Sequence, residues 1–157
     1  MAAKGEERRL ARSAARLAAV QALFQMEATK ADWREVLEEF ETHRLGAEIE
    51  GEALRAPDLG LLRALIEGAV SRQAQIDQAT DAALKESWPI GRIDPTLRAL
   101  FRAAGAELFD MTDTPPKVVI SEFVDVAKAF FPGGKEPGLV NAVLDRLARQ
   151  ARPEAFA

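Results

Sequence analysis

Four arginines near the amino terminus are the residues of this sequence best suited to chemistry with an anion. They are Arg8, Arg9, Arg12 and Arg16, and a guanidinium fork binds phosphate oxygens bidentately. On a helix these residues gather along one side, since successive side chains are rotated by about 100°. The sequence thus predicts an arginine ridge that could follow a nucleic-acid backbone and release its counterions. An ordinary solvated helix face explains the same charges equally well.

The net charge does not by itself indicate a nucleic-acid partner. The 157 residues hold 21 Lys and Arg against 25 Asp and Glu, a formal charge of −4. This charge is unevenly divided, because residues 1–16 carry five basic and two acidic side chains whereas residues 27–58 carry four basic and ten acidic ones. A basic helix on an acidic protein would concentrate nucleic acid on one surface.

The other residues that could catalyse a reaction or bind a metal ion do not form a site. The sequence has no cysteine, and its one histidine, His43, has no partner at the spacing of a metal site or a catalytic triad. Carboxylates such as Asp77 and Asp81 are typical of a solvated helix surface. The stretch Gly133-Gly134-Lys135 lacks the first glycine and the Ser or Thr of a phosphate loop. We therefore expect no enzymatic activity, no cofactor and no metal ion.

The composition is that of one globular domain spanning residues 1–157. Apolar residues make up 48% of the chain and charged residues 29%, which is enough to bury a core and to keep the surface polar. The charged amino terminus and the lack of an apolar run of about 18 residues predict neither a signal peptide nor a membrane span. We expect a cytoplasmic location.

The spacing of apolar residues predicts an all-α, compact bundle of six to seven helices. Asp94-Pro95 is the strongest start signal, because a capping carboxylate precedes a proline at the first helical position. The third helix is nearly 30 residues long and is expected to bend near Gly68 or after Arg72. Residues 47–56 are expected to form a loop. The expected helices run from about Glu7 to Glu27, Asp32 to Gly46, Pro57 to Ser87, Pro95 to Phe109, Lys117 to Phe130, and Pro137 to a point before Pro153.

Three stretches of the chain, taken together, are specific enough to suggest a family. They are Arg8 to Arg12 with Ala19 to Gln25, then Trp88 to Leu108 with its core Arg92-Ile93-Asp94-Pro95, then Ile120 to Lys128 with Leu139 to Asp145. In this order they resemble the transcription antitermination protein NusB family over nearly the whole chain. The resemblance implies two three-helix bundles that share a core, and a protein that is not an enzyme. It also implies binding of the boxA element of nascent RNA together with NusE, a small-subunit ribosomal protein, to help RNA polymerase pass terminators, notably in ribosomal RNA operons.

The resemblance also implies roles for particular residues. Leu139 replaces the usual Phe and cannot stack on a base as an aromatic ring does, and Leu97 occupies a position that is often acidic. The matching residues Arg102, Glu107 and Asp145 are interpreted as a charged network that pins helices together. The RNA-binding residues implied are Arg8, Arg9, Arg12, Arg16, Lys128, Leu139 and Asn141, and the NusE-binding residues are Phe24, Leu97 and Arg98.

Two other functions stay open at this point. The same helical fold resembles the RNA-binding domain of ribosomal RNA cytosine methyltransferases, although these 157 residues contain no glycine-rich strand–helix unit for a methyl donor. A protein-interaction bundle with a solvated arginine ridge and no RNA binding is the third hypothesis.

Overall fold

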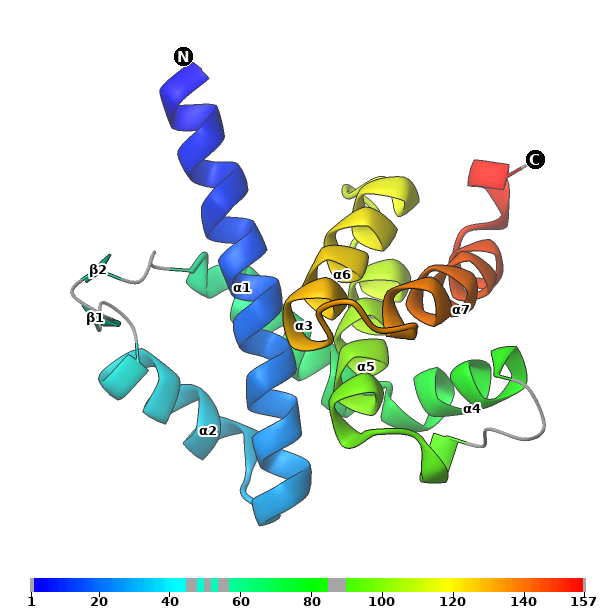
Figure 1. Ribbon diagram of the computed structural model, residues 1–157, viewed down its shortest axis with the longest axis horizontal. Coiled ribbons are helices and arrows are strands. Elements are labelled where there is room, and N and C mark those ends of the chain that lie inside the picture. Colours follow the sequence, from blue (N-terminus) through cyan, green and yellow to red (C-terminus); the bar gives the residue numbers. More distant parts are fainter. Residues whose placement is uncertain (1, 45–47, 50–51, 54–56, 85–89, 157) are drawn as a thin grey trace.

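The computed structural model describes residues 2–44, 48–49, 52–53, 57–84 and 90–156, and these residues are almost entirely helical (Figure 1). Seven α-helices lie within this part of the chain, which confirms the predicted all-α fold. A short antiparallel pair, β1 (Glu48–Ile49) with β2 (Glu52–Ala53), lies where only a loop was expected. The helices are α1 (Ala2–Thr29), α2 (Trp33–Glu39), α3 (Leu59–Ser71), α4 (Gln73–Ala83), α5 (Pro95–Asp110), α6 (Pro116–Phe130) and α7 (Glu136–Ala151). Single helical turns span Phe40–Arg44, Ile90–Arg92 and Pro153–Phe156.

Aspartates at three helix starts satisfy backbone amides that have no partner within the helix. The side chain of Asp32 accepts from the amide of Arg34 at 2.8 Å, and Asp94 accepts from the amide of Thr96 at 2.7 Å. Asp58 caps α3 through the amide of Leu61 at 3.0 Å. Such caps contribute about 1 kcal/mol each. The start predicted at Asp94-Pro95 is confirmed, and so is the start at Asp32.

The predicted long third helix is divided into α3 and α4. The break falls at Arg72, whose φ of −109° and ψ of 15° are not helical. This position is the second of the two expected for a bend. The predicted end of this helix, at Ser87, lies outside the described residues, and α4 already ends at Ala83.

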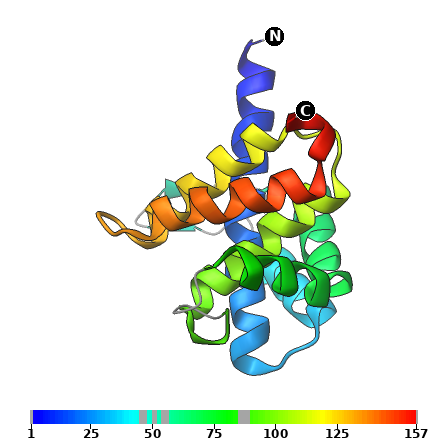
Figure 2. The same ribbon diagram turned by 90° about the vertical axis from the view of Figure 1, so that its right-hand side faces the viewer.

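Helix α5 is the centre of the molecule and packs against α1, α3, α4, α6 and α7 (Figures 1 and 2). The small residues of α5 let the neighbouring helices approach it closely. One cluster of buried apolar side chains therefore runs through the whole set of helices. Helix α2 packs against α1 and α3 on one side, whereas α6 and α7 pair on the other. The buried residues of α5 are Leu97, Ala99, Leu100, Phe101, Ala103, Ala104, Gly105, Ala106, Glu107 and Leu108.

The contact between α4 and α5 at Gly105 is expected to be sensitive to the addition of a single methyl group. A Cβ at this position would lie 2.6 Å from Cγ2 and 3.0 Å from Cγ1 of Ile76. We expect Gly105→Ala to lower the free energy of unfolding by about 1–3 kcal/mol, the usual cost of overpacking. Chemical denaturation measures this change. Gly138→Ala is the matched control, because its Cβ meets nothing within 4 Å and alanine is the better helix former, by about 1 kcal/mol. Equal effects at the two positions would contradict the packing described for α4 and α5.

Candidate nucleic-acid interface

The amino-terminal turns of α1 extend beyond the other helices and carry the exposed part of the arginine ridge (Figure 1). Arg8 and Arg9 are exposed, and Arg9 forms a salt bridge with Glu6 at 2.6 Å in which both side chains are more than half exposed. Arg12 is partly buried, and its nearest carboxylate oxygen, on Asp58, lies 3.6 Å away. An exposed pair such as Arg9 with Glu6 is worth about 0–1 kcal/mol, and the contact of Arg12 with Asp58 is long at 3.6 Å. These guanidinium groups are therefore available to an incoming anion at little cost.

Arg16 does not belong to the exposed ridge, which corrects the expectation from the sequence. Its side chain is only 3% exposed, and its Nε and Nη2 donate to the two carboxylate oxygens of the fully buried Glu107, each at 2.8 Å. Its Nη1 lies 3.1 Å from Oε1 of Glu122. Burial lowers the pKa of Arg16, but the hydrogen bonds and charge of Glu107 and the charge of Glu122 outweigh it and raise that pKa. Arg16 is a charged residue that fixes α1 to α5 and α6.

The ridge forms one wall of a cleft of about 340 Å³ between α1 and the segment that leads from α5 into α6. This volume is at the lower end of the range for small-ligand pockets, about 300–1,000 Å³. The cleft is defined by residues of opposite charge and by two apolar side chains. Its lining residues are Gly5, Arg8, Arg9, Arg12, Arg16, Asp113, Thr114, Pro115, Val118 and Glu122. We call it the arginine cleft.

The second wall of the arginine cleft is held in place by a residue that the sequence did not single out. Arg152, at the end of α7, is buried and donates to the backbone carbonyls of Glu107 and Leu108, each at 2.9 Å. It also donates to the carbonyls of Met111 and Thr114. A cation is favourable at the carboxyl end of a helix, where the helix dipole is negative. Arg152 therefore fixes the turn that precedes α6.

The other predicted RNA-binding residues lie elsewhere on α6 and α7. Lys128 is exposed and lies 3.9 Å from Asp125, Asn141 is exposed, and Leu139 is partly buried against the core. Figure 2 shows α6 and α7 as a hairpin whose connecting loop is far from the start of α6. Ten residues of helix separate Lys128 from Val118, or about 15 Å. None of the three lines the arginine cleft, so a ligand would have to be extended to contact both places.

Phe24 lies on a second surface, between α1 and the ends of α5 and α6. Its side chain is 41% exposed and lines a cleft of about 400 Å³ with Thr96 and Phe130. Leu97 does not share this surface, because it is 2% exposed and packs in the core. The expectation that Leu97 stands on the partner face is therefore corrected. The predicted partner residue Arg98 is largely buried and bonded to Glu27.

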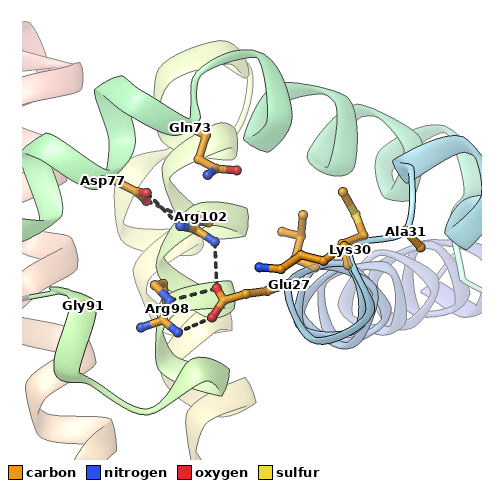
Figure 3. A pocket seen from close by; sticks show the side chains of 10 residues that line it. Glu27, Lys30, Ala31, Gln73, Asp77, Gly91, Arg98 and Arg102 are labelled. Carbon is orange, nitrogen blue, oxygen red and sulfur yellow. Dashed lines mark hydrogen bonds and ion pairs between the residues drawn. The ribbon is translucent and has the colours of Figure 1, made fainter.

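Arg98 and Arg102 belong to a charged network that joins α1, α4 and α5 around a cavity of about 650 Å³ (Figure 3). Glu27 accepts from Nε of Arg98 at 2.8 Å and from Nη1 of Arg102 at 3.0 Å. Asp77 accepts from Nε and Nη2 of Arg102 at 2.9 and 2.8 Å. The predicted pinning role of Arg102 is confirmed, and Asp77 is not the simple surface charge that we expected.

Of the other two residues predicted for such a network, one has that role and one does not. Glu107 pairs with Arg16 across two helices. Asp145 pairs at 3.0 Å with Arg149 one turn further along the same helix, so this contact connects no two helices. The side chain of His43 lies outside the described part of the structure.

The Glu27 network should make stability depend on pH in the acidic range. Hydrogen bonds from Arg98, with the charges of Arg98 and Arg102, lower the pKa of Glu27. A carboxylate whose pKa is lower in the folded state stabilises the fold above its unfolded pKa, about 4.3, and loses this contribution as the pH falls through the folded value. We expect Glu27→Gln to have a lower Tm than the parent chain at pH 7. This difference in Tm should become smaller below about pH 4. Thermal melts from pH 7 to pH 3 measure this difference, and a constant difference would argue against the ion pairs.

The described residues contain no group of three or more His, Cys, Asp or Glu side chains placed to hold a metal ion. No helix in the described part of the chain is long and apolar enough to cross a bilayer.

The fold and its two clefts define a helical-bundle binding protein with a cationic face on an acidic body. The NusB family model matches residues 13–149, and the chain belongs to this family. The chain is 47% identical to the transcription antitermination protein NusB of Rhodopseudomonas palustris (strain BisB18), over 99% of this chain and 91% of that protein. It is also 47% identical to the protein of the same name from Rhizobium etli (strain CIAT 652), over 92% and 89% of the two chains.

Solved structures share the fold. NusB of T. maritima is 31% identical and superposes with a TM-score of 0.73, covering 92% of this chain and 96% of that one. A structure of the antitermination factors NusB and NusE in complex with dsRNA gives a TM-score of 0.71 at 22% identity, over 88% and 96% of the chains. At this identity the two proteins are alike in fold.

Proposed function

We propose that this chain is a transcription antitermination factor that binds the boxA element of nascent RNA through the arginine ridge and acts together with NusE. The observation that carries the proposal is the exposure of Arg8 and Arg9 on the amino-terminal turns of α1, with the partly buried Arg12 beside them in the same cleft. Guanidinium groups bind phosphate oxygens bidentately, and several of them on one helix can follow an RNA backbone and release its counterions. Lys128 and Asn141 would contact the same strand further along.

The comparisons support this proposal. The relatives of R. palustris and R. etli bear the name transcription antitermination protein. The solved complex of a NusB protein contains NusE and dsRNA, although the RNA that we propose here is single-stranded. Read-through by RNA polymerase, notably in ribosomal RNA operons, is the cellular outcome that we propose, and the cytoplasm is where that RNA is made.

NusE would occupy the surface around Phe24. An exposed aromatic ring beside a cleft is typical of the centre of a protein interface. The acidic body of the chain favours a basic partner, such as a ribosomal protein, and disfavours unselective RNA binding. We therefore expect modest affinity for RNA from this chain alone and tighter binding when NusE is present.

Titration of labelled boxA RNA with the full chain, with and without NusE, tests the proposed function. We expect NusE to lower the Kd at least tenfold, and Phe24→Ala to reduce this enhancement without changing the Kd measured for the chain alone. An RNA affinity that is unmeasurable in both titrations would favour the protein-interaction hypothesis. If the Kd for boxA RNA were the same with and without NusE, the proposed joint action with NusE would be wrong.

A further inference from the structure

Glu122 is one of two acidic residues that line the arginine cleft, the other being the exposed Asp113. Glu122 stands on α6 opposite the arginine ridge and keeps 18% of its side chain exposed. A carboxylate at this place repels phosphate oxygens, so it has either a purely structural role or a ligand with hydrogen-bond donors.

The contacts of Glu122 with Ser13 and Arg16 do not occupy all the hydrogen-bond acceptor positions of its carboxylate. An ionised carboxylate has about four acceptor positions. The hydroxyl of Ser13 lies 3.0 Å from both oxygens but carries only one hydrogen, and Nη1 of Arg16 approaches Oε1 at 3.1 Å. Within the described part of the chain, two acceptor positions are therefore left on a carboxylate that borders the cleft.

The walls of the arginine cleft fit the face of a nucleobase. Val118 is 42% exposed and is one of four large hydrophobic residues exposed in the described part of the chain. Pro115, one turn earlier, is also exposed and lines the same wall. Single-stranded RNA is recognised when unstacked bases rest against such side chains and hydrogen-bond along their Watson–Crick edges. Arg8 and Arg12 on the facing wall suit the phosphate of the same nucleotide.

Two parallel donors distinguish one base from the other three. Guanine presents N1–H and an amino group side by side, which matches the two oxygens of a carboxylate. Adenine and cytosine present an amino group next to an acceptor nitrogen, and uracil presents one N–H between two carbonyl oxygens. The acceptor atoms of these three bases face the negative charge of a carboxylate, so they would be disfavoured.

We infer that Glu122 is a specificity-determining residue, whose carboxylate accepts two hydrogen bonds from an unstacked guanine held in the arginine cleft. This inference rests on the proposed RNA binding and extends it, because it states which base the cleft selects. Arg16 and Ser13 act as positioning residues that fix the carboxylate. Replacing guanine by inosine removes only the amino group, and thus one of the two hydrogen bonds.

Competition binding with nine-nucleotide RNAs tests the inference. Each RNA is oligouridylate whose central position is guanosine, inosine, adenosine, cytidine or uridine. With the full chain we expect the guanosine RNA to bind about tenfold more tightly than the inosine RNA, the cost of one hydrogen bond to a charged group. In Glu122→Gln this ratio should fall to about two or less.

Asp113→Asn is the matched control, because it removes one negative charge from the same cleft at an exposed residue. This variant should bind all five RNAs more tightly by the same factor, so the tenfold preference for the guanosine RNA over the inosine RNA should remain. Equal binding of the guanosine and inosine RNAs to the parent chain would overturn the inference and leave the proposed function standing. This comparison uses the parent chain alone, so it does not depend on whether a variant folds. A tenfold ratio that persists in Glu122→Gln would also overturn it. Failure of all five RNAs to bind a chain that still binds boxA RNA would likewise overturn the inference, whereas failure of boxA RNA to bind as well would overturn the proposed function.

Discussion

Replacing Glu107 with alanine is expected to lower the free energy of unfolding by about 3–5 kcal/mol, the usual cost of breaking a buried ion pair from one side. Arg16 is 3% exposed and makes two of its hydrogen bonds, each 2.8 Å long, to this carboxylate. Without Glu107 the guanidinium would remain charged in the core, with Glu122 as its remaining partner. For a chain of this size the Tm should fall by roughly 10 °C. Chemical denaturation and thermal melts measure the two quantities.

Two further variants separate the ion pair from the loss of a side chain. The double variant Arg16→Met with Glu107→Leu replaces the pair by apolar groups of similar size, and we expect it to recover most of the lost stability. Glu67→Ala removes the carboxylate of an exposed pair with Arg63 and should cost less than about 1 kcal/mol. If Glu107→Ala cost no more than Glu67→Ala, the buried network would not hold α1 in place.

Reversing the charge of Arg8 and Arg12 together is expected to weaken RNA binding by about a hundredfold or more. Each arginine is proposed to contribute one charge-assisted contact to phosphate, worth about 1.5–3 kcal/mol. The slope of log K against log salt should also become shallower, by about 1.4 for two phosphate contacts to a single strand. Titrations of the Arg8→Glu, Arg12→Glu variant at several salt concentrations measure both changes.

The matched control reverses the charge of two arginines on another side of the molecule. Arg34 and Arg63 are mostly exposed and lie beside the ring of Trp33, on α2 and α3. The variant Arg34→Glu, Arg63→Glu changes the net charge by the same amount, so any effect of total charge appears in both variants. Equal losses of affinity would mean that RNA senses the overall charge and not the arginine ridge.

The helices were predictable because their signals are local. Asp94 and Pro95 specify a helix start through capping and a fixed φ, whatever the rest of the chain does. The break in the third helix was also expected, at one of two positions, and it occurs at Arg72. The family position that assigned Leu97 to the partner face was misleading, because this side chain is buried in the core.

The fate of Arg16 could not be predicted from helical spacing. Spacing places it on the same side of α1 as Arg8, but it cannot say where along the helix the neighbouring helices begin. Arg8 remains exposed, whereas Arg16 is covered by both α5 and α6. Sequence reasoning also missed Glu122 as a site residue, although it lies in the Ile120-Ser121-Glu122 motif. The only signal was that motif, since its partners Ser13 and Arg16 are more than 100 residues away in sequence.

The most direct test of the account is a map of where RNA contacts the protein. We propose to titrate the isotopically labelled chain with boxA RNA and to follow the backbone amide signals by NMR. The account predicts that the largest shift changes fall in residues 5–16 and 113–122, with smaller ones near Lys128 and Asn141 and none along the acidic helix α2. Changes concentrated on α2 or α4, with α1 unaffected, would contradict it.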